Sequence, residues 1–354
     1  MDAQVDKINV GIETKRMITI DGSEGEGGGQ MVRNSCALSL VTGEPFRISN
    51  IRAKRSKPGL MRQHVTAVEA ACVISGSECT GLAVGGSELE FRPGRVIPGE
   101  YLFAVGTAGS TGLVLQTVLM PLILADGPSR LVLEGGTHNM LAPPFDFIER
   151  TFLPVINRMG PSVSARIVRH GFYPRGGGRI EVDITPSPLS PIDCLDRGKP
   201  AGVNAQAVFT GLPFEIAERM LTRAKRDLAD WPDDAFAVRE LPSDQGPGVI
   251  LMLEARYANV TEVVSGFGQL GVPAERLAKT SAARMNGYIE SDAFAGPYLA
   301  DQLVLPFALA GGGAFTTVKP SQHTLTAIDI ARRFTGRAIG LEQQNGGSHL
   351  VSFG

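Results

Sequence analysis

The segment AFTTVKPSQHTLTAIDIARRFTG, residues 314–336, shows the unit from which this chain is built. An apolar strand, Ala314–Val318, leads through Pro320 into a helix of about four turns that ends at Gly336. Proline suits the first helical turn because its missing N–H would be unpaired there, and glycine suits the residue after the last turn because it adopts left-handed dihedrals cheaply. The segment therefore predicts a strand followed by a helix with defined ends.

The same pattern occurs twice more, starting at Lys57-Pro58-Gly59 and at Ala142-Pro143-Pro144, with helices that are expected to end at Gly76 and Gly160. Each occurrence belongs to a longer run of strands and amphipathic helices in the order β-α-β-α-β-β, and the third run is compressed toward the C-terminus. Such alternation is typical of helices layered on sheets. We predict an α/β fold, layered as in α+β proteins, with three β-α-β-α-β-β repeats.

The helices that follow these prolines are expected at 58–75 and 144–159, and a short strand is expected near Leu82. A stretch of about 100 residues with its own strands and helices separates the second repeat from the third, after the connector Pro186–Pro191. We read it as a small α/β domain inserted into the third unit. The predicted division is an N-terminal extension at 1–16, a three-repeat domain at 17–190 and 290–354, and an inserted domain at 191–289.

Composition limits the class of protein. The chain has 354 residues, 43% of them apolar, and a net charge of −2, so it is not a uniformly basic nucleic-acid binder. Its four cysteines show no zinc-ligand spacing and suit a reducing compartment. The N-terminus has no apolar signal region, and the apolar run 113–125 is shorter than the roughly 20 residues that span a bilayer. We expect a cytoplasmic protein without a membrane partner.

His323 lies in the first turn of the third Pro-started helix. A histidine there can simply cap the helix or lie on the surface. The alternative is catalytic, because the positive end of the helix dipole disfavours imidazolium and leaves a ring nitrogen free as a nucleophile. The same N–H groups can hold a phosphate beside that nitrogen. A histidine that attacks phosphorus would benefit from both effects.

A glycine-rich turn, Gly25–Gln30, follows a strand and opens a helix, as a phosphate loop does. It fits neither a Walker A motif nor GxGxxG. Glu26 within it would repel phosphate unless a metal lies between them. Asp301, near the start of another helix, is either a favourable first-turn charge or a second ligand for Mg²⁺. Arg33 lies about two turns further along the helix that the loop opens.

The segment 46–68 holds six basic residues and no acidic one, so it is either a solvated face or a phosphate-binding wall. Tyr298 is either a core residue or a surface for a nucleobase. Gln116, among leucines and valines, needs a partner if it is buried. Pro143 and Phe147 belong to an apolar helix entry that suits an adenine face about as well as core packing.

These residues together resemble the RNA 3′-terminal phosphate cyclase family, from about Met17 to Phe353. The similar motifs are DGSEGEGGGQ (21–30), RAKRSKPGLMRQH (52–64), GSTGLVLQ (109–116), RHGFYPRGGG (169–178), DQGPG (244–248), YLADQ (298–302) and PSQH (320–323). The first sixteen residues lie outside the resemblance, and Thr324 stands where an apolar residue is expected. Neither departure touches the inferred chemistry.

The resemblance implies a three-repeat cyclase domain with one small inserted domain. It implies ATP-dependent conversion of an RNA 3′-phosphate to a 2′,3′-cyclic phosphate, in which His323 takes AMP from ATP and passes it to the RNA end. The implied partners are ATP, Mg²⁺ or Mn²⁺, and RNA with a 3′-terminal phosphate. A homodimer is compatible with the sequence.

The same matching implies the site residues. His323 is the implied catalytic residue, and Glu26 and Asp301 are the implied metal ligands. The implied nucleotide- and phosphate-binding residues are Gln116, Pro143, Phe147, Tyr298, Leu299, Ala300, Asp301, Gln302, Arg33, Arg52, Arg55 and Gln63. Two other functions remain open. A non-catalytic scaffold for RNA processing would lack the histidine, and an enolpyruvyl transferase on a similar repeat fold would give His323 no role.

Overall fold

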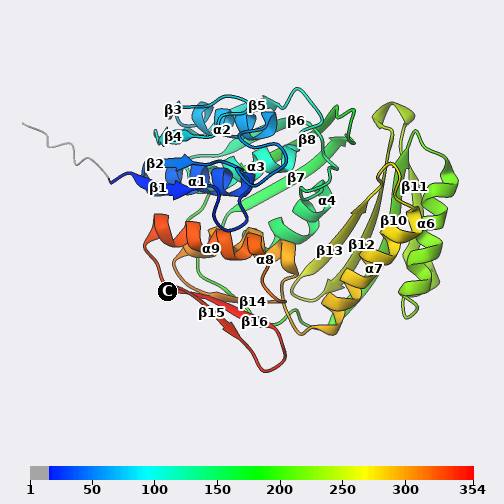
Figure 1. Cartoon of the computed structure of the whole chain (residues 1–354). Helices are drawn as coiled ribbons and strands as arrows, with labels where there is room; N and C mark the ends of the chain where they lie inside the picture. The colour runs from blue at the N-terminus through cyan, green and yellow to red at the C-terminus, as the bar shows by residue number, and fades with distance from the viewer. Residues whose placement is uncertain (1–15) are drawn as a thin grey trace, which may run out of the picture.

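A computed structural model describes residues 16–354 (Figure 1), so nearly all of the predicted extension at 1–16 lies outside the described residues. Three four-stranded sheets share one strand order, in which the first two strands are parallel and the other two pair antiparallel. The first repeat consists of β1 (Ile18–Asp21), α1 (Gly29–Thr42), β2 (Phe46–Ser49), α2 (Arg62–Val73), β3 (Glu78–Thr80) and β4 (Leu89–Arg92), with sheet order β1-β2-β4-β3.

The second and third repeats follow the same plan. The second consists of β5 (Glu100–Ala104), α3 (Thr111–Ile123), β6 (Ser129–Gly135), α4 (Phe145–Phe147), a π-helical turn (Ile148–Phe152), α5 (Leu153–Arg158), β7 (Ser162–Arg169) and β8 (Gly178–Thr185). The third consists of β9 (Asp193–Cys194), α8 (Pro297–Ala310), β14 (Ala314–Thr317), α9 (Gln322–Thr335), β15 (Ile339–Gln343) and β16 (His349–Phe353). Their sheet orders, β5-β6-β8-β7 and β9-β14-β16-β15, match that of the first repeat. The α/β class and the repeats are therefore confirmed.

A fourth sheet, β11-β10-β12-β13, belongs to the segment between β9 and α8. Its elements are β10 (Pro200–Thr210), α6 (Phe214–Asp227), β11 (Phe236–Glu240), β12 (Gly248–Tyr257), β13 (Thr261–Phe267) and α7 (Ala274–Glu290), with two short 3₁₀ turns at Asp233–Ala235 and Ser243–Gln245. β9 pairs in parallel with β14, so residues 193–194 lie in the third sheet although the sequence assigned them to the inserted domain. A two-residue strand is too short to leave a periodic pattern.

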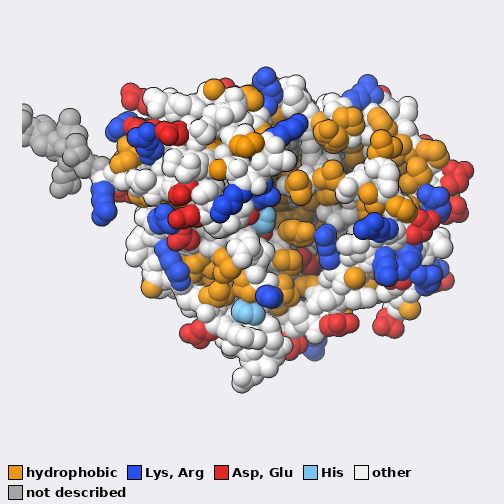
Figure 2. Space-filling view, in the orientation of Figure 1, with side chains coloured by type: hydrophobic (Ala, Val, Ile, Leu, Met, Phe, Trp, Pro, Cys, Tyr) orange, Lys and Arg blue, Asp and Glu red, His pale blue; other side chains and the backbone are white. Residues whose placement is uncertain are grey.

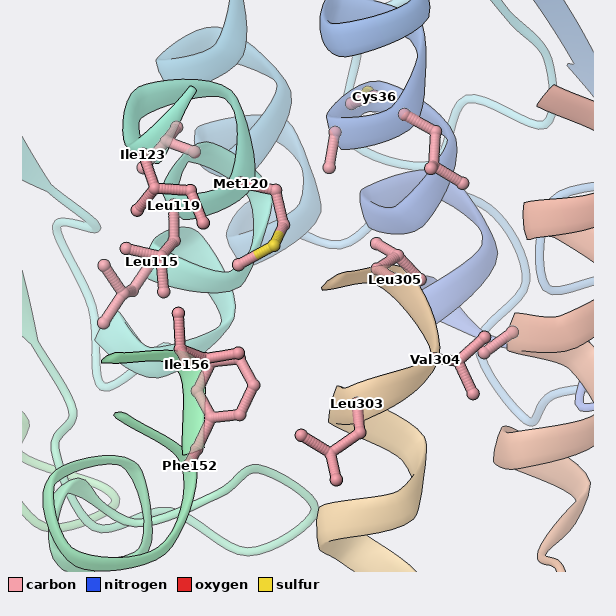
Figure 3. Packing of buried hydrophobic residues seen from close by; sticks show 14 of the residues in the cluster. Cys36, Leu115, Leu119, Met120, Ile123, Phe152, Ile156, Leu303, Val304 and Leu305 are labelled. Carbon is pink, nitrogen blue, oxygen red and sulfur yellow. The ribbon is translucent and has the colours of Figure 1, made fainter. Parts of the chain in front are cut away.

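The helices of the repeats gather in the centre and the three sheets lie around them (Figure 1). α1 packs against α2, α3 and α9, and α8 packs against α9. Figure 3 shows side chains of this packing: Cys36 from α1, Leu115 and Leu119 from α3, and Leu303 from α8. A helix that is apolar on all sides is buried on all sides. Every residue of α3 is buried except Gln116. This side chain is half-buried because its side of the helix faces a cavity.

Two predicted helices differ from the structure. The first begins at Arg62 and not at Pro58, because the N–H groups of Gly59 and Leu60 donate to the carbonyls of Ile51 and Gly86 and so hold this stretch in a turn. The second is interrupted by the π-helical turn that precedes Pro154. Proline has no N–H to donate to the preceding turn, which explains the break. The strand expected near Leu82 lies earlier, at Glu78–Thr80.

The inserted segment contacts the second repeat through charged and polar side chains. Arg169 donates to the Asp244 carboxylate at 2.7 Å, the His170 N–H donates to the Gln245 side chain at 3.0 Å, and Arg150 donates to Glu254 at 3.1 Å. Two of the motifs noted in the sequence, 169–178 and 244–248, therefore meet at this junction. The junction positions β13 and α7 beside the repeats (Figure 1).

Candidate active site

A cavity of about 820 Å³ lies where the three repeats meet the inserted segment. Figure 2 shows a hollow near the middle of the molecule, with Lys and Arg side chains on both flanks. Twelve of the residues singled out in the sequence line the cavity: Glu26, Arg33, Arg52, Arg55, Gln63, Gln116, Pro143, Phe147, Tyr298, Asp301, Gln302 and His323. Leu299 and Ala300 do not line it, since their side chains are fully buried in the core.

His323 is the second residue of α9, which is capped by Ser321. The ring donates from Nδ1 to Oε1 of Gln30 at 2.9 Å, because an amide oxygen can only accept. In the neutral ring this bond leaves the free lone pair on Nε2. Nε2 lies 3.8 Å from a carboxylate oxygen of Glu26, and 47% of the side chain is exposed. The helix start therefore presents one orientated and accessible ring nitrogen to the cavity.

The glycine-rich loop is shaped by what surrounds it. Gly25 and Gly27 have φ of 55° and 61°, which side chains adopt only at a cost. A Cβ on Gly28 would lie 2.2 Å from the Glu26 carboxylate, and a Cβ on Gly29 would lie 2.1 Å from Nε2 of His64. The loop thus needs glycine both for its turns and for the close approach of two side chains to the start of α1.

Glu26 is folded back into the cavity wall. One of its carboxylate oxygens pairs with Arg55, which also donates to the Glu26 carbonyl at 3.0 Å. Its backbone N–H donates to the Thr326 hydroxyl at 2.9 Å, which fixes the loop to α9. The side chain is only 8% exposed, and its Oε2 atom has no hydrogen-bond partner among the described residues. Glu26 thus turns its Arg55-paired oxygen, Oε1, toward the His323 ring and keeps its other oxygen, Oε2, without a partner.

Two further arginines bring positive charge to the same wall. Burial lowers the pKa of Arg33 to about 10, so it remains charged at neutral pH. Its Nε atom is buried and has no hydrogen-bond partner within residues 16–354. Arg52 has φ of 55°, an uncommon conformation for a residue with a side chain, and donates to the carbonyls of Lys57 and Gly59 at 2.6 and 2.8 Å. Hydrogen bonds to the backbone thus hold the Arg52 guanidinium in place, and the buried Arg33 keeps an unpartnered donor.

Asp301 joins α8 to the start of α9. Its Oδ1 atom accepts from the hydroxyls of Ser321 at 2.7 Å and Thr324 at 2.6 Å. Burial raises the pKa of Asp301 above its usual value, although these two hydrogen bonds act in the opposite direction. Thr324 was expected to lie apart from the chemistry, and this prediction is wrong. Its hydroxyl supports a carboxylate that lines the cavity.

A second part of the lining, the flat wall, consists of uncharged ring and amide side chains. Gln116 donates to the Gln302 amide oxygen at 2.6 Å, so each of these half-buried amides has the other as partner. Tyr298 is 42% exposed at the start of α8, and Pro143 lies on the stretch that leads into α4. Phe147 is buried beneath this stretch. An aromatic ring, a proline ring and two amides suit a flat heterocycle that carries hydrogen-bonding edges.

A profile of the RNA 3′-terminal phosphate cyclase family matches residues 24–341 of this chain, which include every residue described above. The chain belongs to the RNA 3′-terminal phosphate cyclase family. Curated proteins named RNA 3′-terminal phosphate cyclase are similar over nearly their whole length. The chain is 50% identical to the one from Koribacter versatilis (strain Ellin345) over 319 residues, 90% of each chain.

Two further proteins with this name are similar to the chain to a comparable degree. The protein from Ectopseudomonas mendocina (strain ymp) is 46% identical over 331 residues, which cover 94% of this chain and 96% of the relative. The protein from Ralstonia nicotianae is 47% identical over 319 residues, with 90% and 91% covered. The predicted resemblance is confirmed, and with it the assignment to a family of enzymes. No helix within residues 16–354 has the length and apolar character to cross a membrane.

The residues that line the cavity can be compared with what the implied metal ion would need. The described residues contain no group of three or more His, Cys, Asp or Glu side chains placed so that they could hold a metal ion. Magnesium in phosphate-transfer sites is usually held by one or two carboxylates together with the substrate's phosphates. The free Oε2 of Glu26 fits that arrangement. The donor set therefore suits an ion that arrives with a nucleotide, not a resident protein-only site.

Sequence reasoning missed several residues that line the cavity. Asn34 lines the cavity, and its Nδ2 atom is buried without a partner in the described part of the chain. His64 also lines it, from the first turn of α2, so a histidine in the first helical turn occurs in two repeats and not in one. From the inserted segment, Arg276, Thr280 and Arg284 line it too. Their four-residue spacing was visible in the sequence, but which side of the helix faced a site was not.

Proposed function

We propose that this protein converts the 3′-terminal phosphate of RNA into a 2′,3′-cyclic phosphate at the expense of ATP, through an intermediate in which AMP is bound to His323. The observation that carries the proposal is the setting of His323. Its Nδ1 is tied to Gln30, and its Nε2 opens into a cavity lined by five arginines, three of them from the repeats. Membership of the cyclase family and the names of its relatives support the choice of reaction.

In the first step Nε2 of His323 attacks the α-phosphorus of ATP. A nitrogen–phosphorus bond forms, the bond from that phosphorus to the pyrophosphate oxygen breaks, and pyrophosphate leaves. The ring gains positive charge as this happens, and the Gln30 oxygen that accepts from Nδ1 stabilises that charge. The cations Arg33, Arg52 and Arg55 balance the phosphate charge, which is the largest electrostatic demand in phosphoryl transfer.

In the second step an oxygen of the RNA 3′-phosphate attacks the phosphorus of the bound AMP. The nitrogen–phosphorus bond breaks and a phosphoanhydride forms between RNA and AMP. In the third step the neighbouring 2′-hydroxyl attacks the RNA phosphorus, its proton passes to water, and AMP leaves as the ring closes. A phosphate oxygen alone is a poor leaving group, whereas AMP on an anhydride is a good one, which is why ATP is needed.

The flat wall suits the adenine of ATP. Tyr298 and Pro143 would bracket the base, and the amides of Gln116 and Gln302 would contact its edges or the ribose. Glu26 and Asp301 would hold a divalent ion together with the phosphates, and the ion would supply charge neutralisation at the reacting phosphorus. The side chains of Leu299 and Ala300 would support this wall from the core.

The test is covalent labelling. Wild type is incubated with ATP labelled at the α-phosphorus and a divalent ion, then run on a denaturing gel. The matched control is Gln322→Ala, an exposed neighbour on α9 that does not line the cavity. We expect an acid-labile, alkali-stable label on wild type and on Gln322→Ala but none on His323→Ala, and discharge of the label by RNA with a 3′-phosphate to give a 2′,3′-cyclic end. Folded wild type without label would overturn the proposal and favour the non-catalytic scaffold.

A further inference from the structure

Helix α7 of the inserted segment forms one side of the cavity that contains His323. Arg276, Thr280 and Arg284 line it at positions i, i+4 and i+8, and residues four apart lie on one face of a helix. The rise of 1.5 Å per residue separates the two arginine Cα atoms by roughly 12 Å. The inserted segment therefore presents two cations and a hydroxyl in a row, beside the arginines of the repeats.

The two cations of α7 are free to bind a ligand. Neither Arg276 nor Arg284 pairs with a carboxylate anywhere in residues 16–354, whereas their neighbour Glu275 pairs with Arg219 at 3.3 Å. Both arginines lie exposed on the cavity side of the helix. An unpaired guanidinium offers a planar fork of donors that matches phosphate oxygens. This face therefore favours an anion with several phosphate groups.

Close packing fixes which face of α7 points at the cavity. A Cβ on Gly266 of β13 would lie 2.3 Å from the Ser281 hydroxyl and 2.6 Å from Leu277, so glycine lets the helix lie directly on the strand. Ala278 and Met285 are fully buried on the side toward the sheet of the inserted segment. The helix cannot rotate without exposing this apolar side. The row of cations is thus a rigid feature of the cavity wall.

The neighbouring surface suits a nucleic acid better than a free nucleotide. Phe267, at the end of β13, lines the same cavity and offers an aromatic ring on which an unpaired base can stack. The repeats already supply Arg33, Arg52 and Arg55 beside His323 for the reacting phosphates. Arg276 and Arg284 belong to a helix of the inserted segment and not to the repeats. They add positive charge to the cavity lining beyond the three arginines of the repeats. A strand with successive phosphates would span both groups.

We propose that the face of α7 made by Arg276, Thr280 and Arg284 binds the sugar-phosphate backbone of the RNA strand that leads to the reacting 3′ end. The inference rests on the proposed function for the identity of the strand. It assigns the inserted segment to RNA binding and leaves the adenylation of His323 to the repeats. The two groups of arginines would then contact different phosphates. The three of the repeats would contact the reacting phosphates, and the two of α7 would contact the RNA backbone.

The test separates RNA binding from chemistry. Binding is measured by fluorescence anisotropy with a single-stranded RNA of about 20 nucleotides ending in a 3′-hydroxyl, longer than the roughly 4–16 nucleotides that one such site covers. Because that RNA cannot react, the measurement holds even if the proposed reaction fails. The variants are R276E/R284E, the charge-preserving R276K/R284K, and the control Lys279→Glu, an exposed lysine of α7 that does not line the cavity. Thermal melting confirms that each variant is folded.

We expect R276E/R284E to weaken RNA binding by about 10-fold or more and to lower the salt-dependence exponent by about 1.4, since each phosphate contact on a single strand contributes about 0.7. Lys279→Glu should bind within about twofold of wild type, and R276K/R284K, which keeps the charge but loses the guanidinium fork, should weaken binding less than R276E/R284E does. Labelling of His323 by ATP should be unchanged in all three. Equal weakening by Lys279→Glu, unchanged binding in R276E/R284E, or loss of ATP labelling in that variant would each overturn the inference, the last by assigning α7 to the triphosphate.

Discussion

The starts of α2 and α9 can be compared directly, because the two helices hold the same position in the first and third repeats. Each carries a histidine in its first turn, His64 in α2 and His323 in α9. The two rings reach adjacent residues at the start of α1: His64 lies against Gly29, and His323 bonds to Gln30. One end of α1 therefore lies between a histidine of the first repeat and a histidine of the third.

The two histidines differ in burial and in hydrogen bonding. His64 is 3% exposed, and its Nδ1 accepts from the backbone N–H of Met61 at 3.0 Å. Burial, with Arg33 and Arg52 nearby, lowers the pKa of His64 to about 3, so it is uncharged at neutral pH. His323 is half exposed and uses Nδ1 as a donor, which leaves Nε2 open to the cavity. The first turn of corresponding helices thus holds a buried histidine in one repeat and a candidate nucleophile in the other.

Replacing the two histidines should change different properties: labelling and activity for His323, and stability for His64. His323→Ala should lower ATP labelling and cyclisation by about 10³-fold or more, as removal of a nucleophile does, with no large change in melting temperature. His64→Ala should keep a labelled His323 but lose about 1–3 kcal/mol of stability, because a buried ring is removed and the part-buried N–H of Met61 loses its acceptor. Labelling gels and denaturant unfolding measure the two effects. A labelled His323→Ala would contradict the assigned roles.

Acid should affect stability through His64. Its pKa of about 3 in the folded chain is below the ordinary value of 6.5, so between these values the unfolded chain binds the proton first. The stabilisation is complete above about pH 6.5 and is lost as the pH falls toward 3. Between pH 7 and 5 wild type should lose about 2 kcal/mol more than His64→Gln. Denaturant midpoints at the two pH values measure this, and parallel losses in both proteins would contradict it.

The glycine that lies against His64 should be intolerant of a side chain. Gly29→Ala brings a Cβ to 2.1 Å from Nε2 of a buried ring, and such overpacking costs about 1–3 kcal/mol. Gly287 is the matched control, since it lies inside helix α7 and a Cβ there meets nothing within 4 Å. Gly287→Ala should stabilise by about 0.5–1 kcal/mol. Calorimetry measures the loss of stability in Gly29→Ala and the gain in Gly287→Ala. Equal shifts in melting temperature in the two variants would contradict the close packing at His64.

The smallest expected effect concerns the start of α9 itself. Thr324→Val keeps the shape of the side chain but removes the hydroxyl that donates to Asp301 at 2.6 Å. One hydrogen bond to a partly charged acceptor contributes about 1–2 kcal/mol. The pKa of Asp301, already raised by burial, should rise further, so cyclisation should decline at a higher pH than in wild type. A pH–rate profile measures this, and an unchanged acid limb would show that Asp301 does not need this partner.

Much of the fold could be read from local patterns. Gly336 adopts a φ of 66° and ends α9, as the sequence pattern predicted. Prediction failed where distant backbone decided the outcome. The N–H groups after Pro58 bond to another loop instead of starting a helix, and β9 is recognisable only because β14 pairs with it. The division into domains and the roles of the site residues remain predictions.

The sequence by itself determined the repeating units, the end of α9 at Gly336 and the place of His323 in the first turn of that helix, because these depend on neighbours within a few positions. Only the tertiary structure decided that His64 is buried while His323 is open, that Glu26 pairs with Arg55, and that the cations of α7 share their cavity. Burial, charge pairing and the facing of a helix depend on contacts between segments far apart in the chain. Local propensity carries no information about which segments those are.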